Sequence, residues 1–95
     1  MRSYELMTIH RPELAEEDVR SQIEDIEKSL GDAGASVTTT DLWGKRRFAY
    51  EIDHVTEGYY TVFGFEAEPE AIDPVDRTLS LRDEVVRHKF TRTGE

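Results

Sequence analysis

The sequence has no cysteine, which excludes disulfides, thiolate metal sites and cysteine nucleophiles. It also has no long apolar run: the chain passes from Met1 into a polar segment, and no later stretch approaches the length that crosses a membrane. We therefore expect a soluble protein without a cleaved export signal. Only 37% of the 95 residues are hydrophobic and 35% are charged, so the chain can bury one small core under a densely charged surface. We expect a single domain over residues 1–95 and no deep substrate cleft.

Basic residues are also few. The chain has 12 Lys and Arg against 21 Asp and Glu, and its net charge of -9 argues at first sight against nucleic-acid binding. The charges are unevenly placed, however, because the segment up to Gly34 is acidic whereas 45–47 and 77–92 are locally basic. Two basic patches on an acidic body therefore make RNA binding possible despite the negative net charge.

Residue types that serve catalysis and metal binding occur without the spacing that their chemistry needs. His10, His54 and His88 have no metal-ligand spacing with one another. The serines lack a nucleophile-elbow motif, and no glycine-rich loop precedes a helical segment. We expect no enzyme activity, no metal and no cofactor.

Hydrophobic periodicity predicts the order strand, helix, strand, strand, helix, strand. The strands are expected at Arg2–His10, at 35–41 continued by 46–53, at 59–67 and at 85–92, with a turn at 54–58. A first helix is expected at about residues 14–31, because apolar residues recur at helical spacing from Val19 to Leu30. Gly31 or Gly34 can cap its end.

The second helix and the long second strand each contain a residue that interrupts regular structure. Apolar residues with helical spacing follow Ile72, but Pro74 lacks a backbone donor. We therefore expect this helix to begin with Asp73 as its N-cap and Pro74 at its first helical position. In the second strand, Gly44 would permit a bulge or a sharp bend.

This element order is the split pattern of ferredoxin-like folds, an α+β class with the order βαββαβ. Both helices would then pack on one face of a four-stranded antiparallel sheet. The other face would stay uncovered, although it receives alternate side chains from every strand. We expect binding on that face or at an edge of the sheet.

Several segments resemble the bacterial small-subunit ribosomal protein six family. They are Met1–Leu6, Trp43–Ile52, 57–60, 65–72 and 85–88, which have the order and spacing of that family and span nearly the whole chain. The resemblance implies a ferredoxin-like fold, a place on the cytoplasmic ribosome, and binding to the central domain of small-subunit ribosomal RNA beside ribosomal protein eighteen. It also implies a protein that is monomeric when free.

The candidate RNA-binding residues are cations and aromatic rings that the strands would present. They are Arg2, Tyr4, Lys45, Arg46, Arg47, Tyr60, Arg87 and Lys89. Arg2 and Tyr4 would share one strand face, and the resemblance favours RNA contact over the alternative that Tyr4 fills the core. Arg87 and Lys89 would share one face of the last strand, where paired cations can bridge phosphates, or where one can reach RNA and the other the partner protein.

The candidate protein-binding residues are apolar or aromatic and lie in or beside the basic run. They are Leu42, Trp43, Phe48 and Tyr50. A run of three bases is commonly a solvated turn, but Trp and Arg are enriched where interfaces carry their binding energy. Aromatic residues from Tyr59 to Phe65 would point to both faces of a central strand, so some would stay available for contacts.

Two functions from different classes remain to be separated. The first is a structural RNA-binding protein, which the charge of -9 predicts to bind RNA weakly alone and cooperatively with a basic partner. The second is a small ferredoxin-like dimeric enzyme or ligand-binding regulatory domain. The second would show a concave pocket with convergent polar groups or a symmetric dimer.

Overall fold

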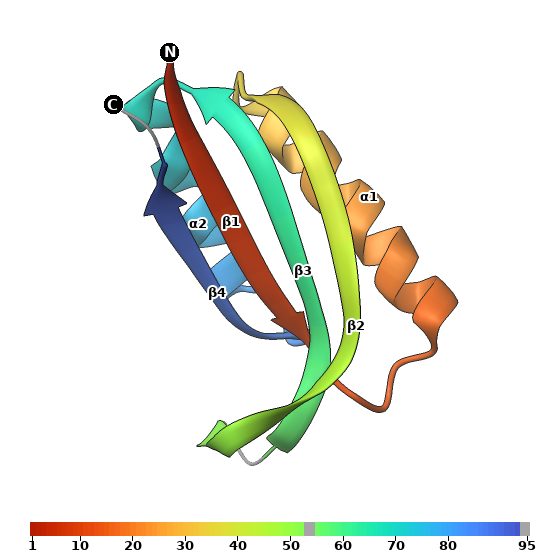
Figure 1. Cartoon of the computed structure of the whole chain (residues 1–95). Coiled ribbons are helices and arrows are strands. Elements are labelled where there is room, and N and C mark those ends of the chain that lie inside the picture. The colour runs from red at the N-terminus through yellow and green to blue at the C-terminus, as the bar shows by residue number, and fades with distance from the viewer. Residues whose placement is uncertain (53–54, 94–95) are drawn as a thin grey trace.

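A computed structural model describes residues 1–52 and 55–93 of the chain. The elements in order are β1 (Arg2–His10), α1 (Glu16–Asp32), β2 (Ser36–Ile52), β3 (Val55–Ala67), the 3-10 turn η1 (Pro69–Ala71), α2 (Ile72–Ser80) and β4 (Val85–Arg92). The strands form one antiparallel sheet in the order β2-β3-β1-β4, and both helices lie on the same side of it (Figure 1). The predicted ferredoxin-like fold is confirmed, with β1 and β3 at the centre.

Helix α1 buries the apolar stripe that its sequence predicts. The buried residues are Val19, Ile23, Ile26 and Leu30. At its end the backbone of Gly34 has φ +96°, a conformation that glycine adopts without strain. Its N–H donates to the Gly31 carbonyl at 3.0 Å, and the Ala35 N–H donates to the Leu30 carbonyl at 2.9 Å. This pair of bonds satisfies carbonyls that the helix leaves open, and Gly34 supplies the left-handed residue directly after the C-cap Ala33.

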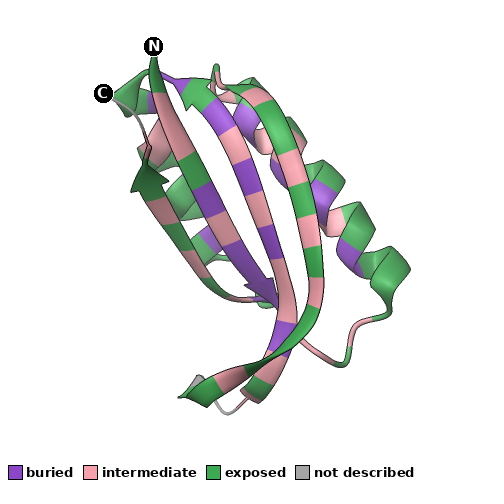
Figure 2. Cartoon of the chain, viewed as in Figure 1, coloured by how far each residue is buried: buried purple, intermediate pink, exposed green. Residues whose placement is uncertain are grey.

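The core lies between the sheet and the helices. Its fully buried members include Leu6 of β1 and Phe63 of β3, which meet Val75 and Leu79 of α2. Buried positions gather on β1 and β3, whereas β2 and β4 are mostly half-buried or exposed (Figure 2). On these central strands, the side chains that point toward the helices are therefore covered, and those on the opposite side face solvent.

The start of the second helix differs from the prediction. Helical backbone begins at Pro69 with η1, α2 begins at Ile72, and Asp73 makes no capping hydrogen bond. Pro74 lies inside the first turn of α2 and not at its first position. A proline is tolerated there because N–H groups of a first turn have few partners within the helix.

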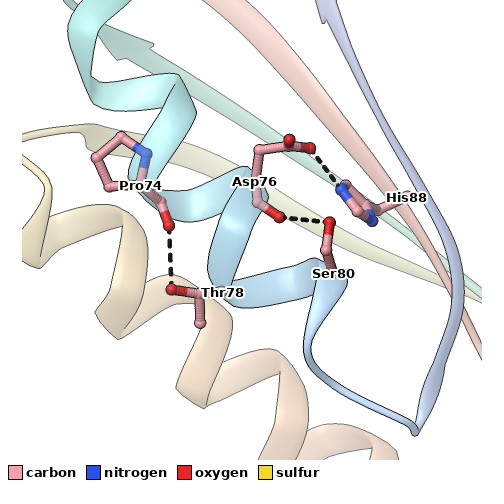
Figure 3. Close-up of polar contacts among 5 residues, drawn as sticks. All are labelled: Pro74, Asp76, Thr78, Ser80 and His88. Carbon is pink, nitrogen blue, oxygen red and sulfur yellow. Dashed lines mark hydrogen bonds and ion pairs between the residues drawn. The ribbon is translucent and has the colours of Figure 1, made fainter.

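Polar contacts fix α2 to β4. His88 Nε2 lies 2.7 Å from Asp76 Oδ1, which joins the strand to the helix (Figure 3). Within α2, the Thr78 hydroxyl donates to the Pro74 carbonyl at 3.0 Å and the Ser80 hydroxyl donates to the Asp76 carbonyl at 2.9 Å. Since His88 points to the helices, alternation turns its neighbours in sequence to the opposite face of the sheet.

The hairpin of β2 and β3 is longer than predicted. Strand β3 begins at Val55, so the expected turn at 54–58 is wrong over 55–58, while Asp53 and His54 lie outside the described residues. Pairing continues past the end of β1 because Arg46 and Arg47 still pair with Gly58 and Glu57. The hairpin consequently extends beyond the helix-covered part of the sheet (Figure 1).

Candidate interaction surface

The uncovered face of the sheet, here called the open face, includes three rows of side chains that cross all four strands. Read from β2 to β4, the paired rows are Thr39–Gly64–Glu5–Thr91, Asp41–Val62–Met7–Lys89 and Gly44–Tyr60–Ile9–Arg87. Rows two residues apart point to the same face of a sheet. Within residues 1–52 and 55–93, no helix covers this face (Figure 1). It is therefore available for binding, as the sequence predicted.

Three rings on the β2 side form an aromatic cluster, defined as Trp43, Phe48 and Tyr60. The Trp43 and Tyr60 rings are stacked, with centroids 6.4 Å apart and planes 3° apart, and Phe48 meets Tyr60 edge-on at 5.9 Å. The Arg46 guanidinium lies 5.7 Å from the Trp43 ring centroid. Trp43 is nevertheless 51% exposed, which is the property expected of a partner-binding residue.

Two glycines shape this cluster. The register of β2 shifts between Leu42 and Gly44, and Gly44 has φ +93°, so the predicted bulge is confirmed and Trp43 lies at it. On β3, a Cβ added to Gly58 would come within 2.7 Å of Ile9 Cγ2 and 3.3 Å of the Phe48 ring. The missing side chain of Gly58 therefore lets Phe48 approach Ile9.

Sequence reasoning missed Gly58 and Ile9 as parts of this surface. Ile9 is only 2% exposed although it lies on the open face, outside the main core cluster. The sequence signal that could have revealed them was Gly58 itself. A glycine beside residues of strand composition often marks a place where another side chain or backbone approaches the strand closely.

The β4 side of the open face is basic. Arg87 and Lys89 are exposed and share this face, as predicted from alternation. Neither side chain makes a hydrogen bond or an ion pair with the part of the chain that the structure describes. Strand β4 also carries Arg92 and has no acidic residue. On the open face, Arg87 and Lys89 therefore lie at the β4 edge, whereas the aromatic cluster and Arg46 lie on the β2 side. Arg92 pairs with Tyr4 and points to the covered face.

Some of the predicted site residues lie on the covered face of the sheet. Arg2 and Tyr4 do share a face, but Tyr4 stacks on Phe65 with centroids 5.6 Å apart and packs against the core. Leu42 is half-buried and packs against the core as well. Tyr4 therefore lies against the core, as in the alternative stated above, because even-numbered residues of β1 point toward the helices.

The basic run divides between the two faces. Arg46 approaches Trp43 on the open face, whereas Lys45 Nζ lies 5.3 Å from the ring of Tyr59, which packs against the core. Alternation puts Arg47 on the same side as Lys45. The charges of this run therefore point to different sides of the sheet. Tyr50 is 70% exposed in the extended hairpin.

His10 belongs to a buried polar group and does not reach the open face. Its Nδ1 lies 2.7 Å from Gln22 Oε1, and its Nε2 lies 2.9 Å from the Thr8 hydroxyl. An amide oxygen only accepts, so Nδ1 carries the proton and Nε2 accepts from Thr8. Burial lowers the pKa of His10.

The described residues contain no group of three His, Asp or Glu side chains that could hold a metal ion.

The open face is hollowed near its centre. The hollow has a volume of about 360 Å³ and is lined by Glu5, Met7, Asp41, Trp43, Val62, Lys89 and Thr91. Met7 and Val62 are paired neighbours and form its floor.

No helix in the described part of the chain has the length and apolar character to cross a membrane.

The family model described as Ribosomal protein S6 matches residues 3–92. The small ribosomal subunit protein bS6 of Desulforamulus reducens is 45% identical over 95 residues, which cover 100% of both chains. The protein of the same name from Carboxydothermus hydrogenoformans is 48% identical over 92 residues, covering 97% of this chain and 96% of that protein. The chain is thus similar to these relatives over at least 96% of their length.

Solved structures give the same picture of the fold. The crystal structure of 30S ribosomal protein S6 from Thermotoga maritima aligns with a TM-score of 0.93 and 28% identity, covering 97% of this chain and 87% of that chain. The C-terminal domain of MgtC from Mycobacterium tuberculosis aligns with a TM-score of 0.59 and 17% identity, covering 98% of this chain and 88% of that chain. At that identity the second likeness concerns the fold alone.

Proposed function

This chain belongs to the ribosomal protein S6 family, and we propose that its open face joins it to the central domain of small-subunit ribosomal RNA and to ribosomal protein eighteen (S18). A structural role in the small ribosomal subunit follows from the family. The RNA site, the identity of the protein neighbour and a monomeric free state are the proposed parts. We propose no catalytic step.

The observation that carries the proposal is the division of the open face. Arg87 and Lys89 form an exposed cationic edge on β4, which suits the phosphate backbone. The aromatic cluster occupies the β2 side, where Trp43 provides the kind of large exposed ring that anchors protein interfaces. RNA would then contact the β4 side and S18 the β2 side, with Tyr50 at its margin.

The remaining predicted residues take supporting places in this proposal. Tyr60 holds Trp43 and Phe48 in the aromatic cluster, so we assign it to the protein side. Arg2, Lys45 and Arg47 would make peripheral phosphate contacts from the other face. Tyr4 and Leu42 support the fold and are left out of the interface.

The helix layer supports an orientation with RNA on the sheet side. Helix α1 carries seven acidic residues and two basic ones. Such a surface repels phosphates, so it would face away from RNA. The protein alone would bind RNA weakly, and a basic partner would strengthen binding by neutralising part of the field.

This function is tested by titrating labelled central-domain RNA with the protein, with and without S18. We expect weak, salt-sensitive binding alone and a large gain with S18. The double variant Arg87→Gln and Lys89→Gln should weaken the ternary complex by about tenfold or more and reduce its salt dependence. The matched variant Lys28→Gln and Arg77→Gln removes the same charge from the helices, so it should show only the long-range part of the loss, which disappears as the salt concentration is raised. Tight, salt-insensitive binding without S18 would contradict the proposal.

A further inference from the structure

The hollow in the open face lies between the proposed RNA edge and the aromatic cluster. Its central row runs Asp41–Val62–Met7–Lys89 across all four strands. Both floor residues are only half-buried, because nothing in the described chain covers them. Trp43 stands at the β2 end of the hollow. The hollow thus offers an apolar floor with charged groups at its rim.

The charges at the rim are free. Glu5 and Asp41 are exposed and come from different strands, and their carboxylates make no hydrogen bond or ion pair with residues 1–52 or 55–93. Lys89 is the one cation among the lining residues and lies at the β4 end of the row. Two carboxylates near an apolar floor repel a phosphate backbone. They attract a side chain that has an apolar stem and a cationic end.

We infer that this hollow receives a basic segment of the protein partner, with a Lys or Arg side chain lying over Met7 and Val62 and its charged end beside Asp41 and Glu5. The inference rests on the proposed function, since it assumes that a protein partner binds the open face. It adds the chemistry by which that partner is recognised.

Complementarity of shape and charge favours this occupant. Lys and Arg bury their methylene stems on apolar surface while their charged ends stay at its margin. A carboxylate is the acceptor to which such ends bind most strongly. The chain carries a net charge of -9, so a protein that binds it gains from being basic. Lys89 would stay outside this contact and remain free for RNA at the β4 edge.

Trp43 makes the hollow directly observable. It is the only tryptophan in the sequence and lines the hollow, so its fluorescence reports binding there. The first probe is a capped hexapeptide of alternating Arg and Val. The second probe is S18 itself. We expect saturable binding of both, weakened about tenfold by Asp41→Asn and by Glu5→Gln. Each change is nearly isosteric and affects an exposed side chain.

The matched control is Glu66→Gln, which removes an exposed carboxylate of β3 on the same face outside the hollow. It should change the affinity for peptide and S18 by less than about twofold. Lys89→Gln should leave peptide binding equal or tighter while weakening RNA binding. An equal loss in Glu66→Gln would overturn the inference, because general electrostatics would then explain the effect.

Other outcomes separate this inference from the proposed function. If S18 binds Asp41→Asn and Glu5→Gln as tightly as the wild type, the hollow is not its site although the proposed function stands. If S18 does not bind at all, the proposed function fails, and the peptide titration still tests the hollow. Burial of Trp43 by dimerisation would overturn the inference in favour of a second copy of this chain.

Discussion

His10 shows how one buried side chain ties the stability of this protein to pH. Its pKa is lowered from 6.5 mainly because burial disfavours the charged imidazole. The unfolded chain therefore binds a proton near pH 6.5, whereas the folded chain binds it only at lower pH. The free energy of unfolding should fall as pH drops below 6.5 toward the folded pKa, by up to about 1.4 kcal/mol per pH unit from this residue. Urea unfolding across that range measures the effect.

His10→Gln is the matched variant for this prediction. It should lower stability near neutral pH, because the bonds to Gln22 and Thr8 are disturbed, and it should flatten the pH dependence relative to the wild type. Comparing the two slopes removes the contribution of the carboxylates and of the other histidines. Equal slopes in the two proteins would show that His10 does not titrate differently on folding.

At the same scale, the sequence was informative about which residues share a face and uninformative about which face is covered. Alternation was enough for Arg87 and Lys89, because His88 between them and Phe90 after them are aromatic and uncharged, a composition typical of the other face. It was not enough for Tyr4, because β1 has large apolar residues on both faces. Only the docking of the helices decides between them, and that depends on contacts far apart in the chain.

At the scale of elements, the type and order of every helix and strand were predictable from periodicity. The boundaries of these elements were not predictable where local rules allowed more than one solution. Pro74 favoured a helix starting beside it, but Pro69 starts an earlier 3-10 turn that carries the chain into α2. The start of β3 was missed because Gly58 suggested a turn, whereas the neighbouring strands use it for close packing.

The hairpin gives a prediction at this scale. Gly58→Ala would place a Cβ within 2.7 Å of both Ile9 Cγ2 and the His10 carbonyl oxygen, and the backbone atom cannot yield without moving β1. We expect a loss of about 1–3 kcal/mol in the free energy of unfolding and a change in Trp43 fluorescence as the aromatic cluster shifts. Denaturant unfolding monitored at Trp43 measures both.

Gly31→Ala provides the control for that substitution. A Cβ at Gly31 would meet nothing within 4 Å, and the residue lies in α1, where alanine is the better helix former. This variant should be as stable as the wild type or more stable, by up to about 1 kcal/mol. If both alanine variants had the same stability, the close approach at Gly58 would not constrain the hairpin.

At the scale of the whole molecule, the layers differ in charge. Strand β4 carries three basic residues and no acidic one, whereas α1 carries seven acidic residues and two basic ones. The net charge of -9 was readable from the sequence, and its separation into layers followed once the fold was known. The sheet can therefore approach RNA although the molecule as a whole is repelled by it.

This separation predicts what happens when acidic charge is removed far from the open face. Glu24→Gln combined with Asp32→Asn removes two exposed carboxylates of α1 and leaves the sheet unchanged. Long-range repulsion should fall, so the protein alone should bind central-domain RNA more tightly at low salt, by a factor of about two to ten. The gain should vanish at high ionic strength, and S18 should bind slightly less tightly. A gain that persists in high salt would mean that α1 contacts the RNA directly, which would contradict the orientation with the helix layer turned away.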